Sequence, residues 1–301
     1  MLNIFLTGSS GFVGKNIINY FNYFKYNLTL FNRGKINIYE FDKHDVFLHF
    51  AGKAHELKKY ESIIDYYETN TELTKSIFDS FLKSSAKVFI TLSSVKAVVD
   101  KSVDPLTEDS LPNPVTHYGK SKQLAEQYIL SKPIPNGKRV YILRPCMIHG
   151  PGNKGNLNLL YKIVNKGFPW PLGAFENKRS FCSIDNLCFI INELINNEAI
   201  PSGVYNIADN EPLATNDLIK LIAESQKKNY HIWNVPKSII KLLSQMGDFL
   251  KLPLNSERLS KLTETYIVSN NKIITAINKP LPLTSKEGLM KTLNSFNTNV
   301  K

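Results

Sequence analysis

A tyrosine and a lysine four residues apart are the side chains in this sequence best suited to acid–base chemistry. Tyr118 and Lys122 lie in a segment, 117 to about 130, whose pattern predicts a helix, and this spacing puts both on one helix face. A phenol, with a reference pKa of about 10, is a poor acid or base at neutral pH, but an adjacent ammonium group favours the phenolate and lowers that pKa. We therefore expect Tyr118 to exchange a proton near neutral pH. An isolated Tyr-x-x-x-Lys match is also typical of a surface pair, so other segments must decide its meaning.

A glycine-rich turn near the start of the chain indicates a site for a dinucleotide. Gly8, Gly11 and Gly14 follow an apolar strand pattern, 2–6, and precede a helical pattern, 15–23. Such a strand, turn and helix hold a pyrophosphate on the amides of the helix N-terminus. Gly8 permits the tight turn, Gly11 lets the backbone approach the phosphates, and Gly14 lets the helix pack close to the strand. The turn alone is weak evidence, because ordinary βα loops also use glycines.

A pair of serines lies between these two motifs. Ser93 and Ser94 directly follow 87–92, whose apolar run predicts a fully buried parallel strand. Open α/β sheets bind their ligands at the carboxyl ends of the strands, which is where these hydroxyls are expected. A glycine turn, a serine pair and a Tyr/Lys pair in this order favour a catalytic role for Tyr118 and Lys122.

The second strand and its successors bear on the choice of nucleotide. Strands are expected at 28–31, 36–41 and 46–50, and the gap between the last two is too short for a crossover helix. Arg33 follows the strand at 28–31, where an NAD site usually has an acidic residue for the ribose. A basic residue there favours NADP over NAD, although an exposed arginine in a turn is an equally ordinary feature.

Two further features are expected to lie close to the cofactor. The segment 49–54 ends its strand in small residues, which suits a backbone pressed against a ligand. Asn70 lies inside a helical pattern at 60–83. A buried asparagine in a helix needs partners, so Asn70 is expected to bridge backbone groups there unless it faces solvent.

Composition narrows the class of protein. The chain has 301 residues, 43% of them hydrophobic, enough for a large α/β core and a smaller lobe, and a formal net charge of +11. The lysines are scattered, which argues against nucleic acid or an acidic membrane surface as partner. No stretch is long and apolar enough to insert into a membrane, and no secretory signal pattern occurs, so the cytoplasm is the expected compartment. The three cysteines show no metal-ligand pairing and are interpreted as buried thiols, and no metal site is expected.

Beyond residue 151 the regular alternation of strand and helix is lost. Helices are expected at 156–166, 185–196, 215–225 and 236–250, the last one strongly amphipathic. We therefore predict a dinucleotide-binding domain over 1–150 and a small, mostly helical substrate lobe over 151–301.

Taken together, these motifs resemble the extended short-chain dehydrogenase/reductase family, in its nucleotide-sugar epimerase, dehydratase and reductase branch. The resemblance covers nearly the whole chain and rests on 7–14, 49–54, Asn70, 92–94, 118–122, 143–152, 179–186 and 204–208. It implies an α/β fold, a Rossmann-type doubly wound parallel sheet with the smaller lobe beside it, in which about 185–210 return to the main sheet through the strand at 204–208. It is also compatible with a homodimer.

The resemblance implies roles for individual residues. Tyr118 would be the acid/base, Lys122 its electrostatic partner and a ligand of the nicotinamide ribose, and Ser94 a hydrogen-bonding partner of the reacting sugar oxygen. Asn156 and Arg179 would hold the diphosphate of the substrate, which suits the bidentate fork of a guanidinium. The full set of implied cofactor-binding residues is Gly8, Ser10, Gly11, Phe12, Val13, Gly14, Arg33, Phe50, Ala51, Gly52, Asn70, Tyr118, Lys122 and Pro145.

Some positions depart from the family pattern and limit the reaction. Lys96 and Val95 replace the Glu and Asp with which the dehydratases eliminate water, so a dehydratase is not expected. His149 replaces a usual tyrosine. The segments 93–96 and 171–181 suggest reduction of a UDP-linked 4-keto-6-deoxy-N-acetylhexosamine in polysaccharide precursor synthesis, with NAD or NADP as cofactor. A UDP-hexose or UDP-N-acetylhexosamine 4-epimerase is the alternative, and a non-catalytic nucleotide-binding regulator is a remote one.

Overall fold

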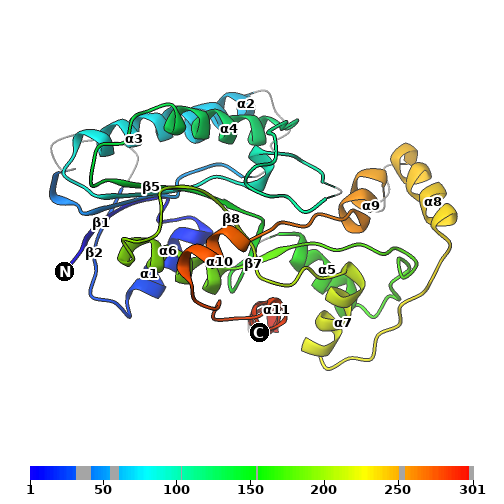
Figure 1. Ribbon diagram of the computed structural model, residues 1–301. Helices are drawn as coiled ribbons and strands as arrows, with labels where there is room; N and C mark the ends of the chain where they lie inside the picture. Colours follow the sequence, from blue (N-terminus) through cyan, green and yellow to red (C-terminus); the bar gives the residue numbers. More distant parts are fainter. Residues whose placement is uncertain (32–41, 55–60, 103, 154, 251–254, 298–301) are drawn as a thin grey trace.

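A computed structural model describes residues 1–31, 42–54, 61–102, 104–153, 155–250 and 255–297. Its centre is a sheet of six parallel strands in the order β2-β1-β3-β4-β5-β8 (Figure 1). The strands are β1 Asn3–Thr7, β2 Asn27–Leu30, β3 Val46–His49, β4 Val88–Leu92, β5 Arg139–Pro145 and β8 Gly203–Ile207. Because β1 lies between β2 and β3, the strand order reverses beside the glycine turn. The predicted doubly wound, Rossmann-type fold is confirmed.

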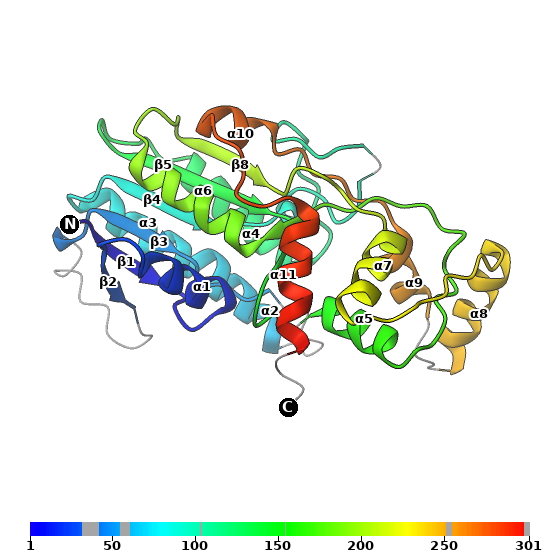
Figure 2. The same ribbon diagram turned by 90° about the horizontal axis from the view of Figure 1, so that it is seen from below.

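Helices cover both faces of this sheet. In Figures 1 and 2, α1 Phe12–Phe21 and α6 Ile184–Asn196 lie on one face, and α3 Leu73–Lys83 and α4 His117–Leu130 lie on the other. Successive side chains of β1 lie on opposite faces of the sheet. Ile4 and Leu6 belong to the core that contains α1 and α6, and Phe5 belongs to the core that contains α3. Both faces of the sheet are therefore apolar, which explains the unbroken apolar runs of its central strands.

One predicted helix differs from expectation. The segment expected as a single helix over 60–83 consists of α2 Glu61–Tyr66, the π-helical turn η2 Tyr67–Glu72 and α3. Asn70 lies in η2, and π-helical turns are frequent at functional sites. The expected strand at 36–41 and Arg33 lie outside the described residues, so these two predictions stay predictions.

The second half of the chain returns to the sheet and also builds a separate core. Strand β8 pairs with β5 in parallel, as predicted, with Pro145 opposite Ile207. The short strands β6 Met147–His149 and β7 Phe181–Ser183 pair with each other. The remaining helices are α5 Asn156–Asn165, α7 Thr215–Ser225, α8 Lys237–Leu250, α9 Ser256–Thr263, α10 Asn271–Ile277 and α11 Ser285–Asn297. A 3-10 turn, η3 Val95–Ala97, follows β4.

A second hydrophobic cluster, called here the lobe cluster, holds these outer elements together. It contains buried residues of α5, α7, α8, α9 and α11 together with Phe181 of β7. The predicted boundary between domains at residue 150 stays a prediction.

Candidate active site

The structure brings Ser94 and Tyr118 together at the carboxyl end of β4. Helix α4 begins directly after Thr116, whose hydroxyl accepts a hydrogen bond from the Gly119 amide at 3.1 Å and caps the helix. This start places Tyr118 in the first turn, where its side chain is hydrogen-bonded to the Ser94 side chain. The Ser94 hydroxyl also accepts a hydrogen bond from the Lys96 amide at 3.2 Å. The hydrogen bond to the Lys96 amide thus fixes Ser94, and the Thr116 cap fixes the helix turn that carries Tyr118.

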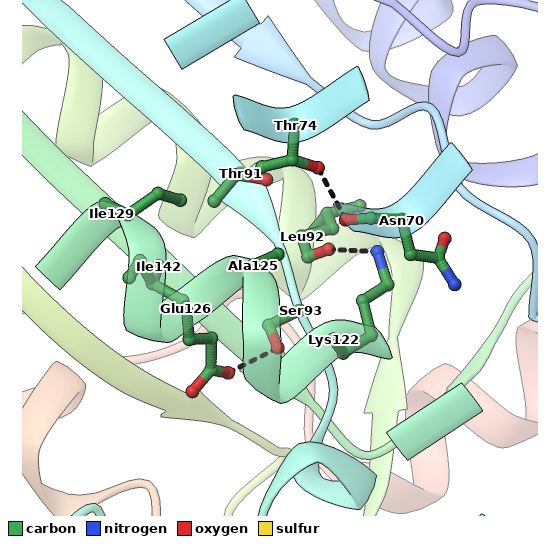
Figure 3. Close-up of a pocket in the computed structure, with 10 residues that line it drawn as sticks. All are labelled: Asn70, Thr74, Thr91, Leu92, Ser93, Lys122, Ala125, Glu126, Ile129 and Ile142. Carbon is green, nitrogen blue, oxygen red and sulfur yellow. Dashed lines mark hydrogen bonds between the residues drawn. The ribbon is translucent and has the colours of Figure 1, made fainter. Parts of the chain in front are cut away.

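Lys122 lies one helical turn after Tyr118 and is almost completely buried. Its Nζ donates a hydrogen bond to the Leu92 carbonyl at 2.8 Å, and Figure 3 shows the side chain reaching from α4 to the end of β4. Burial lowers the pKa of Lys122 to about 8, and the charge of Glu126 opposes that shift. The lysine is still mainly charged at neutral pH.

The pKa of Tyr118 moves in the direction opposite to the one expected. Burial raises this pKa above its ordinary value of 10, and the hydrogen bond with Ser94 only partly offsets the rise. Tyr66 raises the pKa further. The expectation that Lys122 makes Tyr118 a phenolate near neutrality is therefore wrong for the protein groups alone, because desolvation of the phenolate dominates.

Asn70 bridges backbone groups, as predicted, and ties the loop after β3 to α4. Its side chain accepts a hydrogen bond from the Lys53 amide at 2.9 Å and donates to the Lys53 carbonyl at 3.0 Å. It also donates to the Ser121 hydroxyl at 3.0 Å. A Cβ on Gly52 would lie 3.0 Å from both the Asn70 Oδ1 and the Lys122 Nζ. The glycine thus lets this loop pass close to Lys122.

The glycine turn has the shape that a bound phosphate group needs. Gly8 has φ +75°, and a Cβ on it would lie 2.5 Å from the Ala51 amide nitrogen, so the turn lies against the loop that contains Phe50 and Ala51. A Cβ on Gly14 would lie 2.2 Å from the Gly8 carbonyl oxygen. Gly11, the N-cap of α1, has no side chain, no other described side chain caps this helix, and its first turn contains no acidic residue, so its amides can receive an anion. These features fit the pyrophosphate of NAD(P).

The other residues of the predicted cofactor set lie around this turn and the strand ends. Ser10 is exposed beside the turn, Val13 is half-buried in α1, and the ring of Phe12 would lie 3.3 Å from a Cβ on Gly150. Pro145 is buried at the end of β5.

The two residues predicted to bind the substrate diphosphate lie in the outer part of the chain. Arg179 is partly buried, and its Nη1 donates a hydrogen bond to the Lys261 carbonyl of α9. Burial lowers the pKa of its guanidinium, and the charge of Glu264 opposes that shift. Arg179 forms a β-bridge with Tyr266, which packs in one hydrophobic cluster with Cys146, the residue after β5. Asn156 opens α5, and its side chain lies outside the described part of the structure.

A buried ionic cluster behind the Tyr/Lys pair was not predicted from the sequence. Arg144 of β5 contacts both carboxylate oxygens of Glu126, with distances from Nε of 3.0 and 3.2 Å and from Nη2 of 2.6 Å. Ser93 also donates a hydrogen bond to Glu126, and Figure 3 shows this contact beside Lys122. A small cavity lies between these groups and Asn70. Glu126 is four residues after Lys122, a spacing that could have suggested a partner.

A buried histidine that contacts β1 and α3 was also not predicted from the sequence. His49, at the end of β3, lies 2.8 Å through Nδ1 from the Thr7 hydroxyl and 2.9 Å through Nε2 from the Thr74 hydroxyl. Burial and the charge of Lys122 lower its pKa to about 3. His49 is therefore neutral and fixes β1, β3 and α3 relative to one another. His149, the family departure, is also fully buried, with its Nδ1 2.9 Å from the Thr292 hydroxyl of α11.

Comparison with known proteins decides the family. The model of the NAD dependent epimerase/dehydratase family matches residues 4–208. The chain belongs to this family. The UDP-glucose 4-epimerase of Vibrio cholerae is 30% identical, over 98% of this chain and 95% of that protein. The N-acetyl-alpha-D-glucosaminyl-diphospho-ditrans,octacis-undecaprenol 4-epimerase of Escherichia coli O157:H7 is 28% identical, over 76% of this chain and 71% of that protein. The resemblance derived from the motifs is confirmed, and the protein is an enzyme of this family.

Solved structures agree with the fold. The UDP-glucuronic acid 4-epimerase from Bacillus cereus in complex with NAD has a TM-score of 0.77 and 17% identity, with full coverage of both chains. RMD from Pseudomonas aeruginosa complexed with NADPH has a TM-score of 0.73 and 20% identity, covering 99% of this chain and 100% of that one. None of the helices in the described ranges has the length and hydropathy needed to cross a lipid bilayer.

Proposed function

We propose that this enzyme transfers a hydride between NAD(P)H and C4 of a UDP-linked sugar, and that its reaction is the reduction of a 4-keto-6-deoxy-N-acetylhexosamine. The observation that carries the proposal is the hydrogen-bonded Ser94–Tyr118 pair beside the buried Lys122, at the carboxyl ends of the strands that follow the glycine turn. A hydroxyl pair with a neighbouring ammonium group is suited to protonating a carbonyl oxygen.

The chain offers partners to the pyrophosphate and to the nicotinamide half of the dinucleotide. The turn of Gly8 to Gly14 and the first amides of α1 would hold the pyrophosphate, Tyr118 and Lys122 would contact the nicotinamide ribose, and Pro145 would contact the ring. The reduced nicotinamide, when bound there, supplies the hydride. We also propose that NADP is preferred over NAD, because Arg33 follows the second strand. Arg33 itself lies outside the described residues.

Proton transfer is the task of the protein. Tyr118 would donate its proton to the 4-keto oxygen while Ser94 donates a hydrogen bond to the same oxygen and stabilises its developing charge. Lys122 would then stabilise the phenolate that remains. Since burial raises the pKa of Tyr118, the phenol is protonated at neutral pH, which is the form that a reduction requires at its start.

Epimerisation at C4 is the second candidate, and two relatives favour it by name. An epimerase begins with oxidation of the 4-hydroxyl, for which Tyr118 must be a phenolate, and then reduces the keto sugar from its other face. The same three side chains serve both reactions. The difference lies in whether the sugar turns over within the site before it is reduced.

One experiment separates these candidates. Purified enzyme is incubated with a UDP-4-keto-6-deoxy-N-acetylhexosamine and either NADH or NADPH, and in parallel with UDP-hexoses and UDP-N-acetylhexosamines without added cofactor. Net consumption of reduced nicotinamide with the keto sugar supports the reductase. Interconversion of the C4 isomers without net consumption supports the epimerase. If the enzyme binds the cofactor but neither reaction occurs, the proposed function is wrong and a nucleotide-binding regulator becomes the better interpretation.

A further inference from the structure

Glu126 joins three elements whose ends form the candidate active site. On α4 it lies one helical turn after Lys122, and it accepts a hydrogen bond from Ser93, the residue before Ser94 at the end of β4. Arg144, at the end of β5, contacts both of its carboxylate oxygens, with Nε 3.0 Å from Oε1 and Nη2 2.6 Å from Oε2. One carboxylate therefore connects α4, β4 and β5 directly behind the reacting groups.

The charges of this cluster are almost completely withdrawn from water. The side chains of Arg144 and Glu126 are 6% and 4% exposed, and Lys122 is 7% exposed. Desolvating two opposite charges costs about as much as their attraction returns, so apolar side chains of similar size would stabilise this core as well. A role in the site explains the pair better than stability does.

Lys122 is the group whose charge most needs support here. Its Nζ donates a hydrogen bond to the Leu92 carbonyl, a neutral acceptor that does not balance the charge. Burial lowers the pKa of Lys122 to about 8, and the negative charge of Glu126 opposes that shift. Figure 3 shows both side chains reaching from α4 to the same strand end, Lys122 to Leu92 and Glu126 to Ser93. Without Glu126 the ammonium group would lose its proton more readily.

The other titratable groups around Lys122 in the described part of the chain bring no unpaired negative charge. His49, at the end of β3, has a pKa of about 3 and is neutral. On the loop after β3, Lys53 forms an ion pair with Asp65 of α2. Tyr118 on α4 is protonated, because burial raises its pKa. Glu126 thus provides the negative charge that acts on Lys122.

We propose that Glu126 is a positioning residue of the acid–base site, which keeps the ammonium group of Lys122 charged beside Tyr118. Arg144 and Ser93 hold the carboxylate for this task. The three charged groups carry one positive charge in excess while Tyr118 is protonated, and a phenolate on Tyr118 would balance it, so the excess charge favours release of the proton. The use of this effect in catalysis rests on the proposed function, whereas the effect itself needs no substrate.

NMR spectroscopy of the enzyme labelled with carbon-13 at the lysine Cε atoms measures the effect without substrate or added nucleotide. The signal of Lys122 is identified by its loss in Lys122→Met and is followed from about pH 6 to 10. In the wild type it should titrate with a midpoint of about 8. Glu126→Gln keeps the shape of the side chain and removes its charge, so the midpoint should lie about one pH unit lower.

Two further variants control for a general loss of charge and for misfolding. Glu193→Gln on α6 removes a carboxylate that is 12% exposed and pairs with Lys279 at 2.8 Å, and it should leave the Lys122 midpoint at the wild-type value. If Glu126→Gln does not fold, because it leaves Arg144 buried without an anion, Glu126→Gln/Arg144→Met removes both charges. In this double variant the midpoint should still lie below that of the wild type.

Turnover gives a second measurement. On a substrate that the wild type turns over, the alkaline decline of kcat should begin at a lower pH in Glu126→Gln than in the wild type, because Lys122 loses its proton earlier. A Lys122 midpoint unchanged in Glu126→Gln and in the double variant overturns the proposal, since a carboxylate that only supports the fold would leave it there. A lowered midpoint in an enzyme that turns over none of the tested sugars supports the link from Glu126 to Lys122 and contradicts the proposed function alone.

Discussion

Desolvation and hydrogen bonding act in opposite directions on the proton of Tyr118. The hydrogen bond with Ser94 stabilises the phenolate, but burial of the ring destabilises it by more, and the pKa rises. The proton therefore stays on Tyr118 until a reaction develops negative charge on a nearby oxygen. In the proposed reduction such a site is prepared to give a proton, and Lys122 would act after the transfer.

Removing this one hydroxyl should abolish most of the catalysis. Tyr118→Phe keeps the ring and its packing, so it should fold normally and lose little affinity for NAD(P)H, because Lys122 can still contact the ribose. Turnover should fall by ~10²–10⁴-fold, the contribution typical of a positioned acid or base. Tyr67→Phe is the control, because it removes a neighbouring phenol that contacts His117 at 3.1 Å. Steady-state kinetics on a substrate that the wild type turns over decides the matter. Wild-type turnover in Tyr118→Phe would show that another group carries the proton.

His49 should make the stability of the fold depend on acid. Its folded pKa of about 3 lies below the ordinary 6.5, so the unfolded chain binds the extra proton between these values. The stabilisation is complete above pH 6.5 and is lost as the pH falls towards 3, by about 1.4 kcal/mol for each pH unit. Urea unfolding of wild type and His49→Gln from pH 7 to about 4 measures the difference, which should shrink as the pH falls. A difference that is constant with pH would contradict the buried neutral imidazole.

At this scale the sequence identified the residues but not their surroundings. Tyr118 and Lys122 could be paired because four residues on a helix is a local spacing, and Ser94 because strand ends of a parallel sheet meet at one edge. The partners of His49 lie 42 and 25 residues away in the chain, where no period connects them. The predicted direction of the Tyr118 pKa shift was wrong for the protein groups alone. The sequence shows the nearby charge of Lys122 but not the burial of the phenol, which raises this pKa.

Among the elements, the glycine turn has the least room for change. A Cβ on Gly14 would lie 2.2 Å from the Gly8 carbonyl, so Gly14→Ala must move the turn or α1 and should cost about 1–3 kcal/mol of stability. NAD(P)H affinity should fall as well, because the amides that face the pyrophosphate move. Gly155→Ala is the control: its φ of −160° is extended and its nearest atom would lie 3.6 Å away, so stability should change by less than about 0.5 kcal/mol. Calorimetry and fluorescence titration measure both effects, and unchanged cofactor affinity in Gly14→Ala would contradict this assignment of the turn.

Element types were predicted better than their ends and interruptions. The helices α1, α4, α5, α6, α7 and α8 follow from periodicity, because apolar faces repeat along them. The strands β1, β3 and β4 follow instead from their apolar runs. The π-helical turn around Asn70 leaves that period almost unchanged, so hydrophobic spacing does not reveal it. The helices α9 to α11 were missed. α9 and α10 have eight and seven residues, too few for a helical period to be distinctive. Nor does periodicity say which face of α8 is covered.

At the scale of the whole molecule, the two cores share a strand. Cys182 of β7 belongs to the core under the main sheet, and its neighbour Phe181 belongs to the lobe cluster. Helix α11 joins the same region, because Thr292 contacts His149 of β6 and Lys291 pairs with Asp185 of α6 at 2.6 Å. A strand with one face in each core cannot leave one of them without disturbing the other. The parts before and after residue 150 are therefore expected to unfold together.

Leu293→Ala tests this coupling. Leu293 of α11 is fully buried in the lobe cluster, and its truncation should cost about 2–5 kcal/mol. If the cores unfold as one unit, scanning calorimetry should show a single transition in the wild type and a single transition at lower temperature in the variant. Leu130→Ala, at an exposed position of α4, should shift the midpoint little. Two resolved transitions, of which Leu293→Ala moves only one, would instead show a lobe that unfolds by itself, because the contacts across β7 would then be too weak to join it to the sheet.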